Sequence, residues 1–256
     1  MIRVFHMSGA GNDFAVVDVR GQKTDLQKLA VKLCKLTGAD GFLAVDESDI
    51  ADFRLHFYNP DGLRGEMCGN GARCVCKFAY DLGIAGETMT VQTDAGLVYG
   101  TRMGENRYQV KLNPPGILDL NRTSDCAYVE LGDPGIPHAV TQVHELSREK
   151  LRQRGIALRH DPAFPKGANV NFYTRLSPDR VRLLTYERGV EDFTLACGTG
   201  SASVAVVLWK KGQLPEGRLI AENQGGTLTV TLSGENGKVT QLLLEGPAEI
   251  VNITEL

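Results

Sequence analysis

Hydrophobic and polar residues alternate along most of the chain, and this period of two predicts a series of short β-strands. Turn-forming Gly, Pro, Asn and Asp residues separate the alternating segments. More strands are expected towards the end of the chain, after residue 212. The other predicted strands cover residues 2–5, 15–19, 42–45, 52–58, 88–93, 96–103, 107–112, 127–131, 139–143, 169–174 and 181–186.

A few segments instead carry apolar residues at the spacing of a helix. Residues 24–36 follow a Thr or Asp cap, and residues 146–156 form a charged helix. Two further helices begin at a Cys-Gly-polar-Gly motif; the first runs from about Asn70 to Leu82 and the second ends at Lys211. Strands thus outnumber helices, and the pattern predicts an α/β (α+β) fold with mostly antiparallel strands.

The two cysteine motifs belong to an internal repeat. Cys68 and Cys197 lie 129 positions apart (197 − 68), and so do Gly83 and Gly212, which follow the two helices. Other matches keep nearly the same offset. They are Arg54 with Arg182, Tyr58 with Tyr186, and Gly96 with Gly226. A repeat in register from strand to helix end predicts two similar domains related by a pseudo-twofold axis, each with mostly antiparallel strands around a central helix. A Pro-rich segment at 113–116 marks the boundary.

Composition narrows the classes of partner. The chain has 256 residues, of which 42% are hydrophobic and 23% charged, and its net charge is −3. This charge disfavours nucleic acid and anionic membrane as partners. No apolar run is long enough to span a membrane, and residues 1–6 lack the pattern of a secretion signal, so we expect a cytoplasmic protein. Dimers are the commonest oligomers, so a homodimer is expected.

Six cysteines are too few for a disulfide scaffold in a chain of this length. Cys68, Cys74 and Cys76 fit no common zinc spacing, and Cys74 and Cys76 would point about 200° apart on a helix. We therefore expect no metal site.

A cysteine at a helix N-terminus has a specific chemical use. The first turn presents unpaired N–H groups and partial positive charge, which bind anions and favour a thiolate. Two such ends facing each other could hold one carboxylate between two sulfur atoms. One sulfur atom would take the α-proton of an amino acid, and the other would return a proton to the opposite face. No lysine stands out as a site for pyridoxal phosphate, so no cofactor is expected and the helix ends must stabilise the carbanion.

Other interpretations remain open. Cys68 and Cys197 could be small buried residues at helix starts. They could also form a redox switch, although a redox pair is normally spaced C-x-x-C, or belong to a small-molecule binding module. The Gly-rich turn at 7–14 could be a hairpin loop or a backbone segment that approaches a ligand.

Three segments together resemble the diaminopimelate epimerase family, and the resemblance covers almost the whole chain. The first is the loop Gly9-Ala10-Gly11-Asn12-Asp13-Phe14. The second is Glu66-Met67-Cys68-Gly69-Asn70-Gly71-Ala72-Arg73-Cys74. The third is Glu187-Arg188-Gly189 followed by Ala196-Cys197-Gly198-Thr199-Gly200.

The resemblance implies a function and a set of roles. Cys68 and Cys197 would be the catalytic base and acid that interconvert L,L- and meso-diaminopimelate without a cofactor. The amides of Gly69, Asn70, Gly198 and Thr199 would hold the reacting carboxylate. Asn12, Asn59, Asn169, Glu187 and Arg188 would bind the substrate, and His138 and Glu187 would tune the thiol pKa values. The family fold also implies that the last strand returns to the first domain, which gives domains 1–113 plus 246–256 and 114–245, with the active site between them.

Two positions depart from the family pattern. The family often has Asn where this chain has Ile136, and Gln after the Asp that corresponds to Asp40, where this chain has Gly41. Both residues would contribute to substrate recognition. A racemase of another amino acid, such as histidine, is therefore the alternative.

Overall fold

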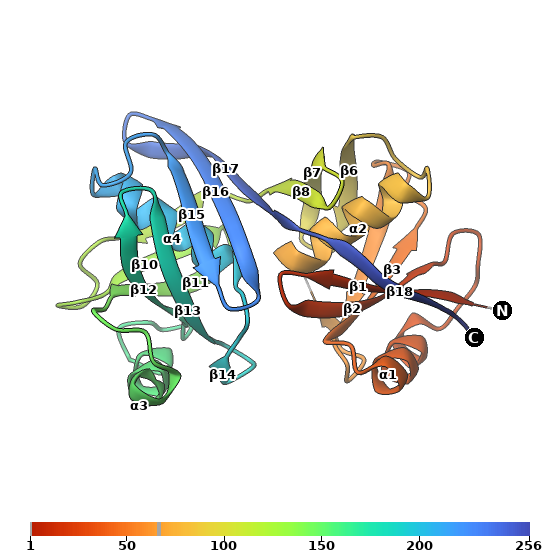
Figure 1. Ribbon diagram of the computed structural model, residues 1–256, viewed down its shortest axis with the longest axis horizontal. Coiled ribbons are helices and arrows are strands. Elements are labelled where there is room, and N and C mark those ends of the chain that lie inside the picture. Colours follow the sequence, from red (N-terminus) through yellow and green to blue (C-terminus); the bar gives the residue numbers. More distant parts are fainter. Residues whose placement is uncertain (1, 66–67) are drawn as a thin grey trace. The chain divides into compact units, whose positions relative to one another are not determined.

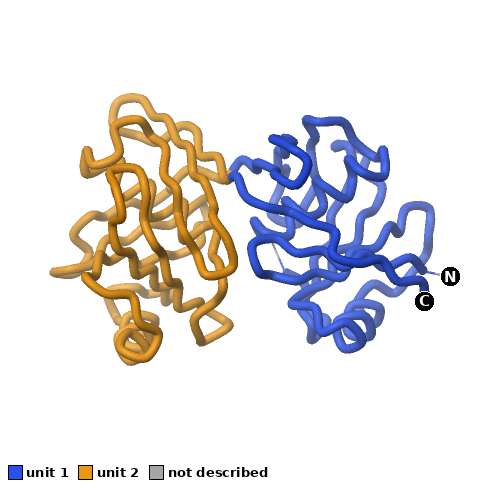
Figure 2. The backbone as a smooth tube through the Cα atoms, in the orientation of Figure 1, with its two compact units in different colours: residues 1–111, 245–256 blue, residues 112–244 orange. Residues whose placement is uncertain are grey.

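The structure is a computed structural model that describes residues 2–65 and 68–256. It divides into two compact units (Figure 2). Unit 1 comprises residues 1–111 and 245–256, and unit 2 comprises residues 112–244. The sequence-based limits were 113/114 and 245/246.

Unit 1 is built from strands that surround one helix (Figure 1). Its helices are α1 (Leu26–Thr37) and α2 (Gly69–Asp81). Its strands are β1 (Arg3–Gly9), β2 (Asn12–Asp18), β3 (Gly41–Asp46), β4 (Phe53–Tyr58), β5 (Arg64–Gly65), β6 (Thr88–Thr93), β7 (Gly96–Gly104), β8 (Arg107–Lys111) and β18 (Glu249–Glu255).

Unit 2 follows the same order of elements. Its helices are α3 (Arg148–Arg159) and α4 (Gly198–Lys210). Its strands are β9 (Pro115–Asp119), β10 (Ala127–Gly132), β11 (Gly135–Gln142), β12 (Asn169–Ser177), β13 (Arg180–Glu187), β14 (Asp192–Phe193), β15 (Arg218–Asn223) and β16 (Gly226–Glu235); β17 (Lys238–Pro247) then runs across the boundary at 244/245.

The strand pairings repeat between the units, which confirms the predicted repeat. In unit 1, β2 pairs in parallel with β3, β3 is antiparallel to β4, and β4 is parallel to β6. In unit 2, the same pairings join β11 to β12, β12 to β13, and β13 to β15. The helices α1 and α3 lie in the β2–β3 and β11–β12 crossovers, and α2 and α4 lie in the β4–β6 and β13–β15 crossovers. The hairpin pairings, such as β1 with β2 and β10 with β11, are antiparallel, so the predicted α/β class with mainly antiparallel strands is correct.

The helices α2 and α4 lie at the centres of their units, where strands cover them on most sides; α4 is apolar nearly all round, whereas α2 also buries Asn70, Arg73 and Lys77. The helix α2 packs against β1, β2, β3, β7, β8 and β18, and α4 packs against β10, β11, β12, β15 and β16. Most residues of both helices are buried. The strands therefore fix the position and direction of the two helix N-termini.

Two Gly-containing segments that lie outside the predicted strands, residues 7–14 and 132–138, are mostly strand. The chain turns between β1 and β2 through Ala10 and Gly11 alone, both with positive φ (58° and 87°). In unit 2, β11 already begins at Gly135. Pro137 fits in this strand because β12 joins β11 only from His138 onwards, so that edge of the strand is open at Pro137. His138 is therefore a strand residue and not a loop residue.

Candidate functional site

Cys68 and Cys197 occupy the same position in their units, as the N-cap residues of the central helices. Cys68 has φ −129° and ψ 119°, and Cys197 has φ −124° and ψ 112°. Both cysteines are therefore extended, and helix geometry begins at the following glycine. The predicted helix starts are confirmed. Glu66 and Met67, which belong to the first cysteine motif, lie outside the described residues.

The sulfur atom of Cys197 accepts a hydrogen bond from the helix it caps. The backbone N–H of Gly200 donates to Cys197 Sγ at 3.3 Å, and the hydroxyl of Thr199 lies 3.5 Å from the same atom. An N-cap acceptor is favoured when it is negative, because the helix end carries partial positive charge. This geometry favours the thiolate form of Cys197.

In unit 1, the first turn of α2 is tied to the β1–β2 hairpin. The buried Asn70 donates from its amide to Asn12 Oδ1, and Asn12 donates to Asp40 Oδ2 at 3.3 Å. Asp40 also accepts from the backbone N–H of Asp13 at 3.0 Å. Two predicted site residues, Asn12 and Asn70, are thus brought together beside Cys68.

The hairpin approaches α2 so closely that it requires a glycine. A Cβ atom on Gly9 would lie 2.8 Å from the carbonyl oxygen of Asn70 and 3.0 Å from Cys74 Sγ. Any side chain at position 9 would push the strand away from the helix. The Gly-rich segment is therefore a β-hairpin, and its strand residues Gly9 and Asn12 hold the helix start in place.

Arg73 is an important residue that the sequence analysis missed. It is fully buried, and its guanidinium group donates to Gly69 O at 3.1 Å, Asn70 Oδ1 at 2.7 Å and Pro247 O at 3.3 Å. Burial lowers the pKa of this group, and the nearby Cys74 and Cys68 oppose that shift. The signal was an arginine within the apolar run at residues 72–76, because a buried charge needs partners.

His138 and Asn171 form the corresponding polar cluster in unit 2. Both side chains are completely buried, and Asn171 Nδ2 lies 3.1 Å from His138 Nδ1. Burial lowers the pKa of His138 to about 3, with the charge of Arg188 acting in the same direction. His138 is therefore neutral near pH 7. Asn171 was not among the predicted site residues, because one Asn in a strand gave no distinct signal.

The end of β13 carries two predicted substrate-binding residues. Burial raises the pKa of Glu187, while the hydroxyl of Thr194, which donates to Glu187 Oε2 at 2.9 Å, opposes that rise. Arg188 is exposed, and its backbone N–H donates to Oδ1 of the buried Asn169 at 2.8 Å. Asn169 therefore fixes the chain where Glu187 and Arg188 emerge from the strand.

Asn59 lies directly after β4 and begins a turn, since its carbonyl oxygen accepts a hydrogen bond from the backbone N–H of Gly62 at 2.9 Å. The nearby Gly41, where the family often has Gln, has a steric reason to be glycine. A Cβ atom there would lie 2.8 Å from the ring of Phe57. The ring of Phe57 occupies the space that a side chain at position 41 would need.

The remaining cysteines are unsuited to proton transfer. Burial raises the pKa of Cys34 to about 11 and those of Cys76 and Cys126 to about 12, and it raises the pKa of Cys74 further still. Within residues 2–65 and 68–256, no group of three or more His, Cys, Asp or Glu side chains is arranged to hold a metal ion.

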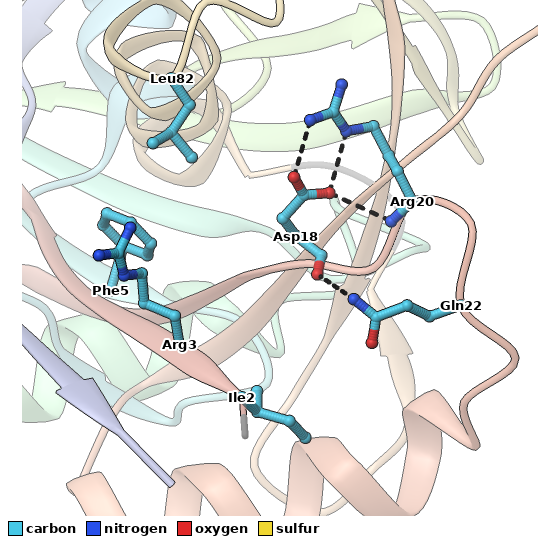
Figure 3. A pocket seen from close by; sticks show the side chains of 7 residues that line it. All are labelled: Ile2, Arg3, Phe5, Asp18, Arg20, Gln22 and Leu82. Atoms are coloured by element: carbon cyan, nitrogen blue, oxygen red, sulfur yellow. Dashed lines mark hydrogen bonds and ion pairs between the residues drawn. The ribbon is translucent and has the colours of Figure 1, made fainter.

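A hollow of about 340 Å³ in unit 1 is lined by none of the predicted site residues. Figure 3 shows Asp18 and Arg20 at this hollow, paired through two side-chain hydrogen bonds of 2.9 and 2.8 Å. Leu82, the C-cap of α2, lines it, whereas Cys68 caps the other end of this 13-residue helix. The two ends are about 20 Å apart at 1.5 Å per residue. The hollow therefore lies at the wrong end of α2 to take part in chemistry at Cys68.

The chain is similar to known proteins over nearly its full length. The family model described as diaminopimelate epimerase matches residues 4–116 and 132–251. The diaminopimelate epimerase of Chlorobaculum tepidum is 36% identical over 253 residues, which cover 96% of this chain and 97% of the relative. That of Flavobacterium psychrophilum is 34% identical over 256 residues, covering 98% of each chain.

Solved structures share the fold at lower identity. A phenazine biosynthesis protein of the PhzF family from Bacillus anthracis has a TM-score of 0.75 at 17% identity and covers 100% of this chain and 98% of its own. A hydroxyproline epimerase from Agrobacterium vitis has a TM-score of 0.70 at 16% identity, with coverage of 100% and 90%. These likenesses concern the fold alone. Among the described residues, no helix has the length and hydropathy needed to cross a membrane.

Proposed function

Since the chain belongs to the diaminopimelate epimerase family, we propose that it interconverts L,L- and meso-diaminopimelate, a step in lysine and peptidoglycan precursor biosynthesis. The observation that carries the proposal is the family likeness over nearly the whole chain. The paired N-cap cysteines, one per unit, support it.

In the proposed reaction, Cys68 and Cys197 act as base and acid. The thiolate of one cysteine takes the α-proton, so the C–H bond breaks and its electron pair stays on the α-carbon. The thiol of the other cysteine then gives its proton to the opposite face of that carbon. The two cysteines exchange roles when the reaction runs in reverse, so one residue pair serves both directions.

The carbanion needs stabilisation, which we assign to the two helix N-termini without a cofactor. The amides of Gly69, Asn70, Gly198 and Thr199 bind the α-carboxylate, where negative charge builds up as the proton leaves. The buried guanidinium of Arg73, fixed to the first turn of α2, adds positive potential at Cys68.

The distal amino-acid centre of the substrate is assigned to the remaining predicted residues. Arg188 is exposed and can bind a carboxylate through two hydrogen bonds, and Glu187 can bind an ammonium group. Asn12, Asn59 and Asn169 complete this set. His138 and Glu187 belong to unit 2, as Cys197 does, and they tune the pKa values of the two catalytic thiols.

The test is exchange of the α-hydrogen of diaminopimelate in deuterated water. We expect substrate-dependent exchange by the wild-type protein after treatment with a chelator and removal of pyridoxal phosphate. Cys68→Ala and Cys197→Ala should each reduce epimerisation at least 1,000-fold, because each removes one of the two proton-transfer groups. Cys34→Ala is the matched control, since Cys34 lies on the buried side of α1 and its loss should leave exchange near the wild-type rate. Absence of exchange by folded wild-type protein would disprove the proposal.

Racemisation of another amino acid, such as histidine, is the second candidate, and Ile136 favours it. This residue lies in β11 opposite Leu131, where the family often has a hydrogen-bonding Asn. A panel of L-amino acids, followed by chiral chromatography, distinguishes the substrates. Turnover of histidine without turnover of diaminopimelate would decide for this alternative.

The alternative from a different class is a thiol switch or binding module that works through a disulfide between Cys68 and Cys197. In this alternative the disulfide-bonded protein is the functional form, so reduction of the disulfide should abolish its function. The epimerase requires reduced sulfur atoms, so a reducing agent should raise its activity.

We place the protein in the cytoplasm and infer a homodimer. Light scattering at several protein concentrations can test the homodimer.

A further inference from the structure

Asn171 stands at the centre of a buried hydrogen-bond network in unit 2. Its side-chain nitrogen lies 3.1 Å from His138 Nδ1, 3.0 Å from the carbonyl oxygen of Ala139 and 3.2 Å from that of Asn169. Its side-chain oxygen accepts from the hydroxyl of Thr185 at 3.0 Å. All the polar atoms of this amide are therefore engaged.

The two carbonyl groups determine which way the amide of Asn171 faces. A backbone carbonyl oxygen can only accept hydrogen bonds, so the NH₂ group must point towards Ala139 and Asn169. The reverse orientation would place the amide oxygen against two other oxygens in a buried site. The hydroxyl of Thr185 fits this orientation as a donor to Oδ1.

This orientation decides the protonation of His138. The NH₂ group of Asn171 has two hydrogens for three neighbouring acceptors, so Nδ1 shares them with the two carbonyl oxygens. An amide nitrogen cannot accept a hydrogen bond, so a proton on Nδ1 would have no acceptor there, and Nδ1 must be unprotonated. A neutral imidazole then carries its proton on Nε2. In the part of the chain that is described, Nε2 is buried and has no hydrogen-bond partner. A buried N–H of this kind is expected to have a partner in the working state, since leaving it unpaired is costly.

The network also touches the start of α4. A Cβ atom on Gly200 would lie 2.2 Å from Asn171 Oδ1, so Gly200 is a glycine because the Asn171 side chain lies against it. The N–H of this same Gly200 donates to the sulfur of Cys197. One side chain thus contacts both His138 and the helix turn that caps Cys197.

We propose that Asn171 is a positioning residue that holds His138 in the Nε2–H tautomer, as a fixed donor to the anionic group at the start of α4. The donor role rests on the proposed function, in which that group is the reacting carboxylate or the Cys197 thiolate. The tautomer itself does not depend on it. Sequence reasoning assigned a role to His138 but not to the residue that sets its protonation.

The test is Asn171→Asp, which replaces the donor facing Nδ1 with an acceptor. Protein labelled with ¹⁵N at histidine reports on each ring nitrogen by NMR. We expect a protonated Nε2 and an unprotonated Nδ1 for His138 in the wild type, and a protonated Nδ1 in the variant. A wild-type His138 with its proton on Nδ1 would overturn the proposal, whatever reaction the protein catalyses.

The pH dependence of epimerisation tests the donor role. In Asn171→Asp, neutral His138 presents an unprotonated Nε2, and this nitrogen gains a proton only when the ring becomes cationic at lower pH. The ratio of variant to wild-type kcat/KM should therefore rise at least tenfold as the pH falls from 9 to 6. A purely structural role predicts a constant ratio, and a constant ratio would overturn the donor role.

Thr185→Val is the matched control for this network. It removes the hydrogen bond to Oδ1 but leaves the two carbonyl groups that orient the amide. We expect the wild-type ¹⁵N pattern for His138 in this variant. If Asn171→Asp does not fold, Asn171→Ala is measured in its place, and a mixture of tautomers is expected. A pattern identical to the wild type in that variant would show that Asn171 does not set the tautomer.

Discussion

At the scale of single residues, buried polar groups set the chemistry around both cysteines. His138 is neutral because imidazolium would lose its hydration in a completely buried site. Arg73 keeps its place through three acceptors, and Asn171 through four partners. The side chains of Arg73 and Asn171 are tolerated inside the protein because their hydrogen-bonding atoms meet fixed neighbours.

The burial of His138 has a consequence for stability that can be measured. Its pKa in the folded protein is about 3, whereas an unfolded histidine has a pKa of about 6.5. The unfolded state therefore binds a proton first as the pH falls, and folding loses stability between pH 6.5 and about 3 at up to about 1.4 kcal/mol per pH unit. Above pH 6.5, His138 contributes no pH dependence.

We expect this dependence to be absent in His138→Gln. The measurement is urea unfolding of both proteins from pH 8 to pH 4, where carboxylate effects are common to both and cancel in the difference. The difference in free energy of unfolding between the wild type and the variant should be constant above pH 6.5. Below pH 6.5 it should change in favour of the variant. Parallel curves over the whole range would contradict a buried neutral histidine.

The role of a residue was predictable from the sequence where the residue belongs to a motif. It was not predictable where the role depends on packing. Cys68, Cys197 and the glycines after them form visible motifs at a fixed spacing. Asn171 and Arg73 gained meaning only from the strands and helix ends around them. Gly41 was read as a lost recognition residue, but the ring of Phe57 gives it a packing role that only the structure reveals.

At the scale of elements, the two central helices were predictable because glycines mark both ends of an apolar segment. The helix α2 was expected from about Asn70 to Leu82 and spans Gly69–Asp81. The strands near Gly and Pro were harder to predict. The short strand β14 and the first residues of β11 pair across a turn with β13 and β10, and their Asp, Gly and Pro residues have low strand propensity, so the local sequence favours a loop there.

The first turn of α2 depends on Arg73, so we expect Arg73→Lys to destabilise the protein by about 2–4 kcal/mol. Lysine keeps the charge but cannot reach Gly69 O, Asn70 Oδ1 and Pro247 O together. The measurement is the free energy of unfolding in urea. Catalysis should fall as well, because Asn70 and the helix start lose their support.

Arg20→Lys is the control for this prediction. Arg20 also forms a forked pair, with Asp18, but its side chain is 37% exposed. Exposed ion pairs contribute about 0–1 kcal/mol, so this variant should remain close to the wild type. Equal effects of the two substitutions would mean that burial of Arg73 does not determine its contribution.

At the scale of the whole molecule, the chain forms two units of the same topology, and unit 1 is discontinuous. Its last strand, β18, pairs with β1 in antiparallel register from Arg3↔Glu255 to Ser8↔Glu249. The same region packs against α2, and Pro247 accepts a hydrogen bond from Arg73. The end of the sequence therefore completes the sheet that holds Cys68.

Removal of residues 249–256 should unfold or loosen unit 1 and leave unit 2 folded. The physical reason is that β1 loses one of its two partner strands and α2 loses part of its cover, whereas unit 2 ends at residue 244. Hydrogen exchange read by mass spectrometry should show loss of protection in β1, β2 and α2, with α4 still protected. Val251→Thr is the control, since Val251 is 67% exposed and the strand remains. Equal loss of protection in both units would contradict this independence.

The discontinuity of unit 1 also sets an order of events during synthesis. Domains usually fold from the N-terminus while the ribosome is still adding residues. In this chain, residues 112–244 are complete before β18 has been made, so the second unit can reach its native state while the first still lacks a strand. The unit whose first strand is translated first is therefore completed last, and one edge of β1 stays unpaired until β18 has left the ribosome.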